Sequence, residues 1–272
     1  MSTPDVQETI AAVRSACLQY DGHDPLDEAV ALALKHHGTD GASVAVADGG
    51  FALVRHDELT LAVAPQARRR GLAGRLLTEV APAARAWSHG DHPGAAALAA
   101  RRGWRRTRDL WVMRRPTSIP LPELVAPDGI RVRGYRDADA EQVLAVNAAA
   151  FAHHPEQGSL DATGLAERMA EPWWDPAGLV IAADADDRVL AFHWTKQHDA
   201  ALGEVYVVAV GPNAQGRGLG RVVTLAGLHH LAGLGVAEVL LYVESDNAPA
   251  VRLYGSLGFE HAARDTHVQY SA

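Results

Sequence analysis

The chain has 272 residues, is 48% hydrophobic, carries a formal net charge of -8 and contains one cysteine, Cys17. This length allows one large core or two smaller ones, the acidic balance speaks against a nucleic-acid partner and favours a cationic substrate, and one cysteine excludes an intrachain disulfide. No run approaches the ~18 apolar residues of a membrane span and the N-terminus lacks a signal peptide's features, so we expect a cytoplasmic protein.

The first half of the chain predicts a helical start, a short β-meander and a helix-rich end. Helices are expected at 5–19, 26–37, 72–86 and about 95–102, and strands at 43–47, 51–55, 58–63 and 104–113. Four prolines then occur between Arg115 and Gly129, where they forbid a helix and favour an extended connector. We therefore predict an N-terminal domain of residues 1–115, a linker of 116–129 and a C-terminal domain of 130–272.

The second half repeats this order of elements. Strands are expected at 130–134, 179–183, 189–197, 204–210, 236–244 and toward Tyr270, and helices beyond Asp137, around 160–170, from Leu219 and from Asn247 to 257. Each half is thus predicted to be of the α/β class, a mixed sheet with helices on both faces.

A glycine-rich turn between a strand and a helix is the strongest local signal. Gly216, Gly218 and Gly220 follow the Val-rich strand and precede the apolar helix. Backbone N–H groups at such a helix start, together with the helix dipole, favour a phosphate. A dinucleotide fingerprint fails because Arg221 stands where the third glycine belongs, and no Gly-Lys-Ser/Thr follows. Taken alone, the pattern also fits a turn with no ligand.

The same turn occurs earlier in the chain. A shift of 147 residues matches seven of the twelve positions from 209 to 220 with identical residues: Ala209, Val210, Pro212, Ala214, Arg217, Gly218 and Leu219. Two copies of one loop at the spacing of a domain predict a tandem repeat.

The motif Gln215-x-x-Gly218-x-Gly220 resembles the acyl-CoA loop of the Gcn5-related N-acetyltransferase (GNAT) family. The order of elements, ending in an Asn-capped helix with a tyrosine and then Gly-Phe, is similar to that family over nearly the whole chain, twice. The resemblance implies two tandem GNAT-fold acetyltransferase domains that use acetyl-CoA as cosubstrate. It assigns these residues to acetyl-CoA binding: Val208, Ala209, Val210, Gln215, Gly216, Arg217, Gly218, Leu219, Gly220, Arg221, Asn247, Arg252, and in the first half Leu61, Ala62, Val63, Arg69, Arg70, Gly71, Leu72, Ala73 and Gly74.

Four motifs of the second half resemble the mycothiol synthase family within the GNAT group. They are the segments 153–158, 192–196, 203–207 and 241–247. The resemblance implies acetylation of the cysteinyl amine of cysteinyl-glucosaminyl-inositol, by direct attack of the amine and without an acyl-enzyme. We expect this small-molecule amine as partner, with no membrane partner, and a monomer is the working expectation for a chain whose sequence does not determine its oligomeric state.

The same resemblance assigns the catalytic residues. Glu204 is the expected base that accepts the proton of the amine, and Tyr254 the expected acid that protonates the CoA sulfur. From the residues alone, Glu204 also fits a strand-end surface acid and Tyr254 fits core packing. The predicted substrate contacts are Glu28, Glu156, Lys196, Glu204 and Tyr242.

The two halves differ at the catalytic positions. Aligning them places Asp57 opposite Glu204, His92 opposite Asn247 and Ala99 opposite Tyr254. The first domain is therefore predicted to be catalytically degenerate.

The sequence also bears on other classes of function. Among the 14 histidines the adjacent pairs point apart on a helix and no metal-ligand spacing occurs, so no metal is expected. A GNAT enzyme for an aminoglycoside-like amine or a protein N-terminus remains open, as does a non-catalytic acyl-CoA sensor, although binding alone needs neither Glu204 nor Tyr254.

Overall fold

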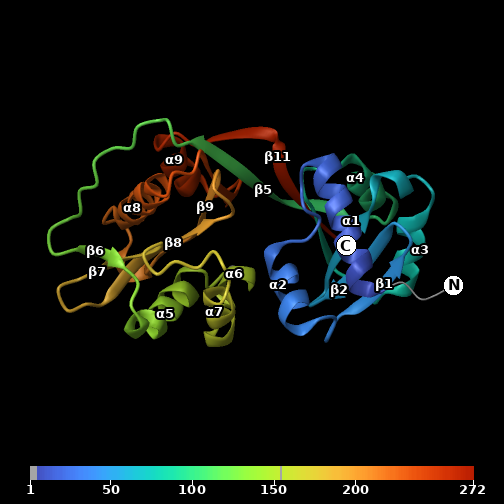
Figure 1. Cartoon of the computed structure of the whole chain (residues 1–272), viewed down its shortest axis with the longest axis horizontal. Coiled ribbons are helices and arrows are strands. Elements are labelled where there is room, and N and C mark those ends of the chain that lie inside the picture. The colour runs from blue at the N-terminus through green and yellow to red at the C-terminus, as the bar shows by residue number, and fades with distance from the viewer. Residues whose placement is uncertain (1–4, 154) are drawn as a thin grey trace. The chain divides into compact units, whose positions relative to one another are not determined.

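A computed structural model describes residues 5–153 and 155–272, with the side chains of residues 155 and 156 outside the description (Figure 1). The chain divides into two compact units. The first comprises the residues up to Trp111 together with Glu244–Asp246 and Ala262–Ala272, and the second comprises Val112–Val243 and Asn247–His261. The predicted class, a mixed α/β sheet with helices on both faces, is confirmed.

In the first unit the strand order is β1-β2-β3-β4-β11-β5. The elements are α1 (Val6–Asp21), α2 (Glu28–His37), β1 (Ser43–Ala47), β2 (Gly50–Arg55), β3 (Glu58–Val63), α3 (Leu72–Glu79), β4 (Arg85–Ser88), α4 (Pro93–Arg101), β5 (Arg105–Pro116) and β11 (Glu260–Ser271). Neighbouring residues of β2 point to opposite faces, so Phe51 packs with α1 and Ala52 packs with α3. Because both faces are covered, β2 is buried along almost its whole length.

One predicted element of this unit is wrong. The helix expected at 72–86 ends at Glu79, and Arg85–Ser88 forms strand β4 between β3 and β11. Pro82 explains the early end, because proline lacks the N–H that a helix needs and clashes with the preceding turn. The alanine-rich sequence near Pro82 did not indicate strand β4, because the conformation of that strand depends on its pairing with β11.

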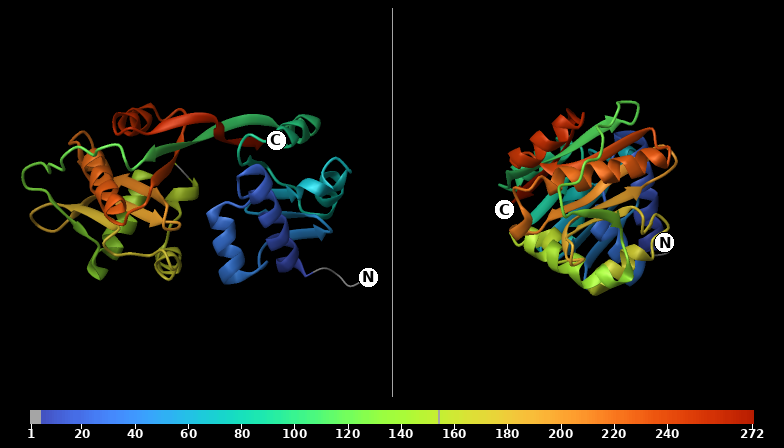
Figure 2. Two further views of the ribbon diagram at one scale, coloured as in Figure 1. Left: turned by 45° about the horizontal axis from the view of Figure 1, so that its top comes forward. Right: turned by 90° about the vertical axis from the view of Figure 1, so that its left-hand side faces the viewer.

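In the second unit the strand order is β11-β5-β10-β9-β8-β7-β6. Its further elements are β6 (Arg131–Gly134), α5 (Ala140–Ala150), α6 (Pro155–Gly158), α7 (Ala162–Met169), β7 (Leu179–Ala183), β8 (Val189–Gln197), β9 (Leu202–Val210), α8 (Leu219–Gly233), β10 (Glu238–Glu244) and α9 (Ala248–Ser256). Helices α5 and α7 cover one face through a core that includes Trp194 and Val207, and α8 covers the other through Val223 and Val208 (Figures 1 and 2).

The long strands β5 and β11 each contribute residues to both units. The end of β11 pairs antiparallel with β4, from Val268 opposite Ser88 to Ser271 opposite Arg85. The last strand of the chain therefore pairs within the first unit. The predicted division of the chain at a single linker, residues 116–129, does not include this return. Within the described residues, no helix has the length and apolar character that crossing a bilayer requires.

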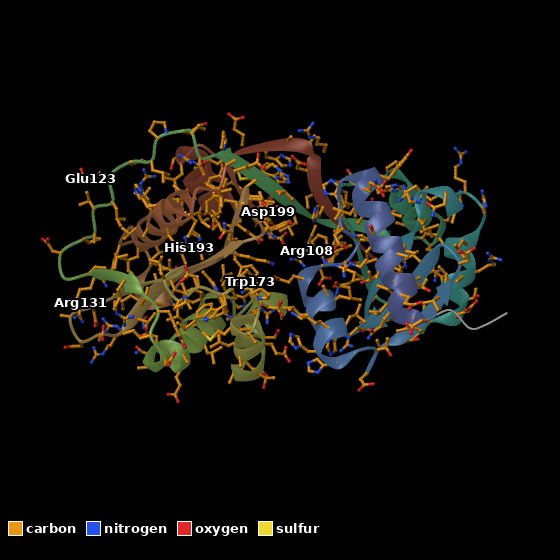
Figure 3. The ribbon with its side chains drawn as sticks, in the orientation of Figure 1. Arg108, Glu123, Arg131, Trp173, His193 and Asp199 are labelled. Atoms are coloured by element: carbon orange, nitrogen blue, oxygen red, sulfur yellow. The ribbon has the colours of Figure 1, made fainter. Side chains whose placement is uncertain are left out.

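His193 on β8, labelled in Figure 3, is fully buried. Its Nδ1 lies 3.1 Å from the carbonyl oxygen of Val223, and its ring occupies the space that a Cβ on Gly227 would fill. Burial lowers the pKa of His193 to about 4, because a charged imidazole there would lose its hydration.

We predict that this histidine destabilises the fold in acid. Between the ordinary pKa of 6.5 and the folded value of about 4, the unfolded chain binds a proton that the native chain does not, so the free energy of unfolding falls as the pH drops. His193→Leu should flatten that fall, which for this residue amounts to roughly 3 kcal/mol. Urea unfolding across this pH window measures it. Equal slopes for both proteins would contradict the prediction.

Candidate active site

The site lies where two parallel strands of the second unit stop pairing. The register between β9 and β10 runs from Leu202 opposite Glu238 to Val205 opposite Leu241. Strand β9 nevertheless continues to Val210, still paired with β8. Beyond Val205, the backbone groups on the edge of β9 that faces β10 are thus not paired with β10. An extended ligand could form hydrogen bonds with this edge.

Glu204 is a buried carboxylate immediately before this point. Its side chain is 7% exposed, and its Oε2 lies 2.6 Å from Nε2 of His198. Its cross-strand neighbour on β8 is Lys196, so both side chains stand on the α5 face of the sheet. Buried carboxylates need partners, and here the structure supplies a histidine.

An irregularity in β9 follows Glu204. The register with β8 shifts between Trp194 and Thr195, so that Val207 pairs with Trp194 and Val205 with Thr195. Tyr206 is the extra residue of this β-bulge, which places both Tyr206 and Val207 on the α5 face. The phenol oxygen of Tyr206 accepts a 2.8 Å hydrogen bond from Nε of Arg168 on α7.

Lys196 is held among aromatic rings on the same face. Its Nζ lies 5.0 Å from the ring centre of Trp173 and 5.4 Å from that of Tyr206. Cation–π attraction of this kind orients an ammonium group without neutralising it. The interpretation of Lys196 as a charged residue of a cleft, made from its place in an apolar strand, agrees with this position.

The glycine loop forms the N-terminus of α8. A single 3-10 turn, η3 (Pro212–Ala214), leads to Gly216 and Gly218, which have φ values of 76° and 75°. That left-handed conformation favours glycine, and an added Cβ would meet no described atom within 4 Å at either residue. Gly220 differs, because a Cβ there would make an ordinary 3.5 Å contact with Val210.

The start of α8 has no capping side chain. Helices α1, α2, α4, α7 and α9 each have a side-chain acceptor at the N-cap, whereas Gly218 offers none to α8, whose first turn also lacks an acidic residue. The unpaired N–H groups and the helix dipole are therefore left to attract an anion. The residues present fit a pyrophosphate.

Helix α9 carries the second expected catalytic residue. Asn247 caps it, with Oδ1 accepting a 3.2 Å hydrogen bond from the backbone N–H of Ala250, as the sequence predicts. Tyr254 is buried and packs edge-on against Phe259. Burial raises the pKa of Tyr254 to about 12, so the phenol keeps its proton at neutral pH. The described residues provide no hydrogen-bond partner for its hydroxyl.

The first unit reproduces the loop. Its β3–β4 pairing stops at Leu59 opposite Ala86 although β3 continues to Val63, and the 3-10 turn η1 (Pro65–Ala67) follows. Gly71 at the N-cap of α3 has φ 76° and Arg69 has φ 62°, close to the values of Gly218 and Gly216. The two copies thus share one backbone conformation.

Side chains of the first loop differ from those of the second. Arg68 stands in place of Gln215, and its guanidinium turns back to Asp21 and to the carbonyl oxygen of Val63, 2.9 Å from Nε. Arg70, with Leu72 and Arg75, borders a cavity of about 310 Å³ beside this loop.

The catalytic positions of the first unit carry other residues. Asp57 lies in an exposed two-residue turn with φ 65°, not within a buried strand as Glu204 does. Ala99 occupies on α4 the position that Tyr254 has on α9, seven residues after the caps His92 and Asn247. At these positions the first unit therefore has a shorter, exposed carboxylate in place of the buried one and no phenol.

A pocket of about 650 Å³ borders the end of β8. Its lining combines indole rings with polar groups, and includes Trp173, Asp175, Lys196, His198, Asp199 and His230, of which Figure 3 labels Trp173 and Asp199. His198 therefore reaches from the buried carboxylate of Glu204 to this pocket. Among the described residues, no group of three or more His, Cys, Asp or Glu side chains is arranged to hold a metal ion.

Comparisons with known proteins bear on this site. A family model described as "Acetyltransferase (GNAT) family" matches residues 149–259. A protein of Nocardioides sp. named mycothiol acetyltransferase is 58% identical, over 98% of this chain and 97% of that protein. Another of the same name from Rhodococcus jostii is 47% identical, over 94% and 92%. The chain belongs to the mycothiol acetyltransferase family.

Solved structures share the fold of this mycothiol acetyltransferase family member. A Gcn5-related N-acetyltransferase from Sphaerobacter thermophilus has a TM-score of 0.70 at 22% identity, covering 99% of this chain and 93% of that chain. A tandem GNAT protein from the clavulanic acid biosynthesis pathway has a TM-score of 0.71 at 17% identity, covering 98% and 95%. The predicted tandem GNAT fold is confirmed, and the chain is an acetyltransferase of a family that generally uses acetyl-CoA.

The expected site residues of this mycothiol acetyltransferase family member lie in several places. Val208, Ala209 and Val210 lie on the open part of β9, and Arg217, Arg221, Asn247 and Arg252 are exposed. Leu61, Ala62 and Val63 lie on the matching part of β3, and Ala73 and Gly74 follow Leu72 in the first turn of α3.

The remaining substrate residues are less closely tied to the site. Tyr242 is exposed on β10, and Glu28 is the first residue of α2 in the other unit, so its expected role stays a prediction. Glu156 lies in α6, with its side chain outside the described residues. Sequence reasoning missed His198 and Trp173, because their roles depend on a hairpin and a loop folding against Glu204 and Lys196.

Tyr254 gives a testable signature in alkali. Between the ordinary pKa of 10 and the folded value of about 12, the unfolded chain loses a proton that the native chain keeps, so the free energy of unfolding falls as the pH rises. Tyr254→Phe should make this fall shallower, as measured by denaturant unfolding. The exposed Tyr20→Phe is the matched control. A Tyr254→Phe slope equal to wild type would show that the phenol titrates normally.

Proposed function

We propose that the chain transfers the acetyl group of acetyl-CoA to the cysteinyl amine of cysteinyl-glucosaminyl-inositol, the last step of mycothiol biosynthesis. The observation that carries the proposal is a buried carboxylate, Glu204, placed where β9 loses its β10 partner, with an uncapped helix start at the other end of the same open edge. The names of the relatives support the choice of substrate.

Glu204 is the proposed general base. An amine attacks a carbonyl only after losing its proton, and a carboxylate within reach, or one water away, accepts it. The acceptor of the acetyl group is the amine itself, without an acyl-enzyme, because the one cysteine lies in the first unit and is engaged with Val63 and Arg68. Lys196 beside Glu204 adds a positive charge that disfavours a protonated amine at the same place.

Tyr254 is the proposed general acid. Acetyl-CoA, when bound, supplies the acetyl group as a thioester whose sulfur must be protonated as it departs. A phenol that stays protonated at neutral pH and has no partner among the described residues is available to donate that proton. Residues of the second loop, from Gln215 to Arg221, would hold the pyrophosphate through their backbone N–H groups.

The polyhydroxyl part of the substrate is proposed to bind beside Lys196. The 650 Å³ pocket offers an amide, carboxylates, imidazoles and two indole rings, which suit hydroxyl groups and the faces of sugar rings. Tyr242 and the predicted Glu28 and Glu156 would complete the contacts.

The first unit is proposed to be a degenerate copy that performs no chemistry. Its loop has the same backbone conformation as the proposed anion site, while the positions of base and acid hold Asp57, which is exposed, and Ala99, which is buried. It would contribute stability, a bound CoA or one wall of the substrate site.

An acceptor comparison tests the function. Purified chain with acetyl-CoA is offered cysteinyl-glucosaminyl-inositol, an aminoglycoside and a peptide with a free N-terminus, and the release of CoA thiol is followed. Turnover should be fastest with the first acceptor. Preference for either of the others would replace the substrate, and acetyl-CoA binding without turnover on any acceptor would favour the sensor.

Glu204→Gln should lower turnover by a factor on the order of 10²–10⁴, because an amide cannot accept the proton of the amine. Affinity for acetyl-CoA, measured by calorimetry, should stay at the wild-type value since Glu204 precedes the open part of β9. A fall in turnover of less than about threefold would remove Glu204 from the role.

Gly218→Trp and Gly71→Trp form a matched pair, because both glycines have φ near 75° and both side chains would enter open space. Backbone strain is therefore similar in the two variants. Gly218→Trp should abolish acetylation by filling the pyrophosphate site of the catalytic unit, whereas Gly71→Trp should keep substantial activity. Equal loss in two proteins that circular dichroism shows to be folded would mean that both units take part in the chemistry.

A further inference from the structure

The hairpin between β8 and β9 holds His198 in a defined place. The backbone N–H of His198 donates a 2.9 Å hydrogen bond to the carbonyl of Leu202. The carboxylate of Asp199 accepts the backbone N–H groups of Ala201 and Leu202 at 2.7 and 2.8 Å, and these bonds lower the pKa of Asp199. The turn is therefore fixed by its own hydrogen bonds.

From this turn the imidazole reaches the proposed base. Nε2 of His198 lies 2.6 Å from Oε2 of Glu204, whose side chain is 7% exposed while that of His198 is 33% exposed. An ionised carboxylate has no hydrogen to donate, so Nε2 carries the proton of this bond. Charge-assisted hydrogen bonds of this length are among the strongest in proteins.

Without the N–H of His198, the carboxylate of Glu204 could form an ion pair with a neighbouring cation instead. The terminal torsion of a glutamate is broad, so the carboxylate rotates easily unless it is held. Lys196 is the cross-strand neighbour of Glu204, and its ammonium lies over the rings of Trp173 and Tyr206. An ion pair between Glu204 and Lys196 would occupy the oxygen that has to accept the proton of the amine.

We propose that His198 is a positioning residue for Glu204. It binds one carboxylate oxygen, leaves the other to the amine, and keeps the base apart from Lys196. This inference rests on the proposed role of Glu204. The other charged or titratable groups of the same pocket are Asp199 and the pair Asp175 and His230, whose Oδ2 and Nε2 are 3.2 Å apart.

Four variants test the inference in the full-length protein: His198→Leu, His198→Gln, Glu204→Gln and the double variant His198→Leu with Glu204→Gln. His198→Leu should lower kcat by about tenfold and leave the KM for acetyl-CoA unchanged. His198→Gln should recover most of the rate, because its amide also presents an N–H. In the Glu204→Gln background, His198→Leu should cost less than about twofold more, since two residues that act as a unit are not additive.

His229→Leu is the control, a histidine on α8 whose Nε2 lies 2.9 Å from the carbonyl oxygen of Pro122, and its kcat should equal that of wild type. Independent, multiplying losses in the double variant would overturn the proposal, as would a wild-type kcat in His198→Leu. If His198→Leu does not fold, His198→Ala, which also removes the donor, decides in the same way: a loss in the Glu204→Gln background equal to that in wild type contradicts the proposal. Wild-type turnover of Glu204→Gln would instead refute the base itself, which separates the two failures.

Discussion

The separation of β9 from β10 after Val205 is the constraint on which the rest of the site depends. Two parallel strands that stay paired satisfy each other's backbone groups, and nothing could lie between them. Once they diverge, β9 offers an open edge that is still rigid because β8 supports its other side through Val210. The bulge at Tyr206 sets which side chains face α5 at this point, with Glu204 just before it. The positions of Glu204, the open edge and the helix N-terminus therefore follow from one strand and the turn after it.

Both units contain the same loop, but the positions of Glu204 and Tyr254 correspond to Asp57 and Ala99 in the first unit. The loops agree in their backbone angles, because each needs the left-handed conformation at Gly71 or Gly218 to begin a helix directly after the turn. The side chains are free to diverge, since they do not determine that backbone. Arg68 has turned back to Asp21, and Ala99 has replaced a phenol. The first loop thus keeps the backbone conformation of the second while its side chains make other contacts.

Much of this could be predicted from the sequence where the signal is local. Glycine spacing, strand alternation and the Asn247 cap depend on neighbouring residues, and the loop, β7 to β9 and α9 lie as predicted. Strand β4 and the return of β11 to the first unit could not be predicted, because their conformation comes from partners distant in sequence.

The residues of the candidate site could likewise be predicted from the sequence only in part. Glu204 and Tyr254 were assigned by resemblance to a family; both side chains are buried, and their catalytic roles stay predictions. His198 carried no signal in the sequence, since a histidine after a strand is ordinary and only the hairpin brings it to Glu204.

The central claim is that this chain acetylates the cysteinyl amine of cysteinyl-glucosaminyl-inositol. Thiol analysis of the host after deletion of its gene tests that claim most directly, by separating and quantifying fluorescently labelled thiols. The account predicts loss of mycothiol and accumulation of unacetylated cysteinyl-glucosaminyl-inositol, both reversed when the gene is returned. Unchanged mycothiol in the deletion strain, with no accumulated precursor, would contradict it.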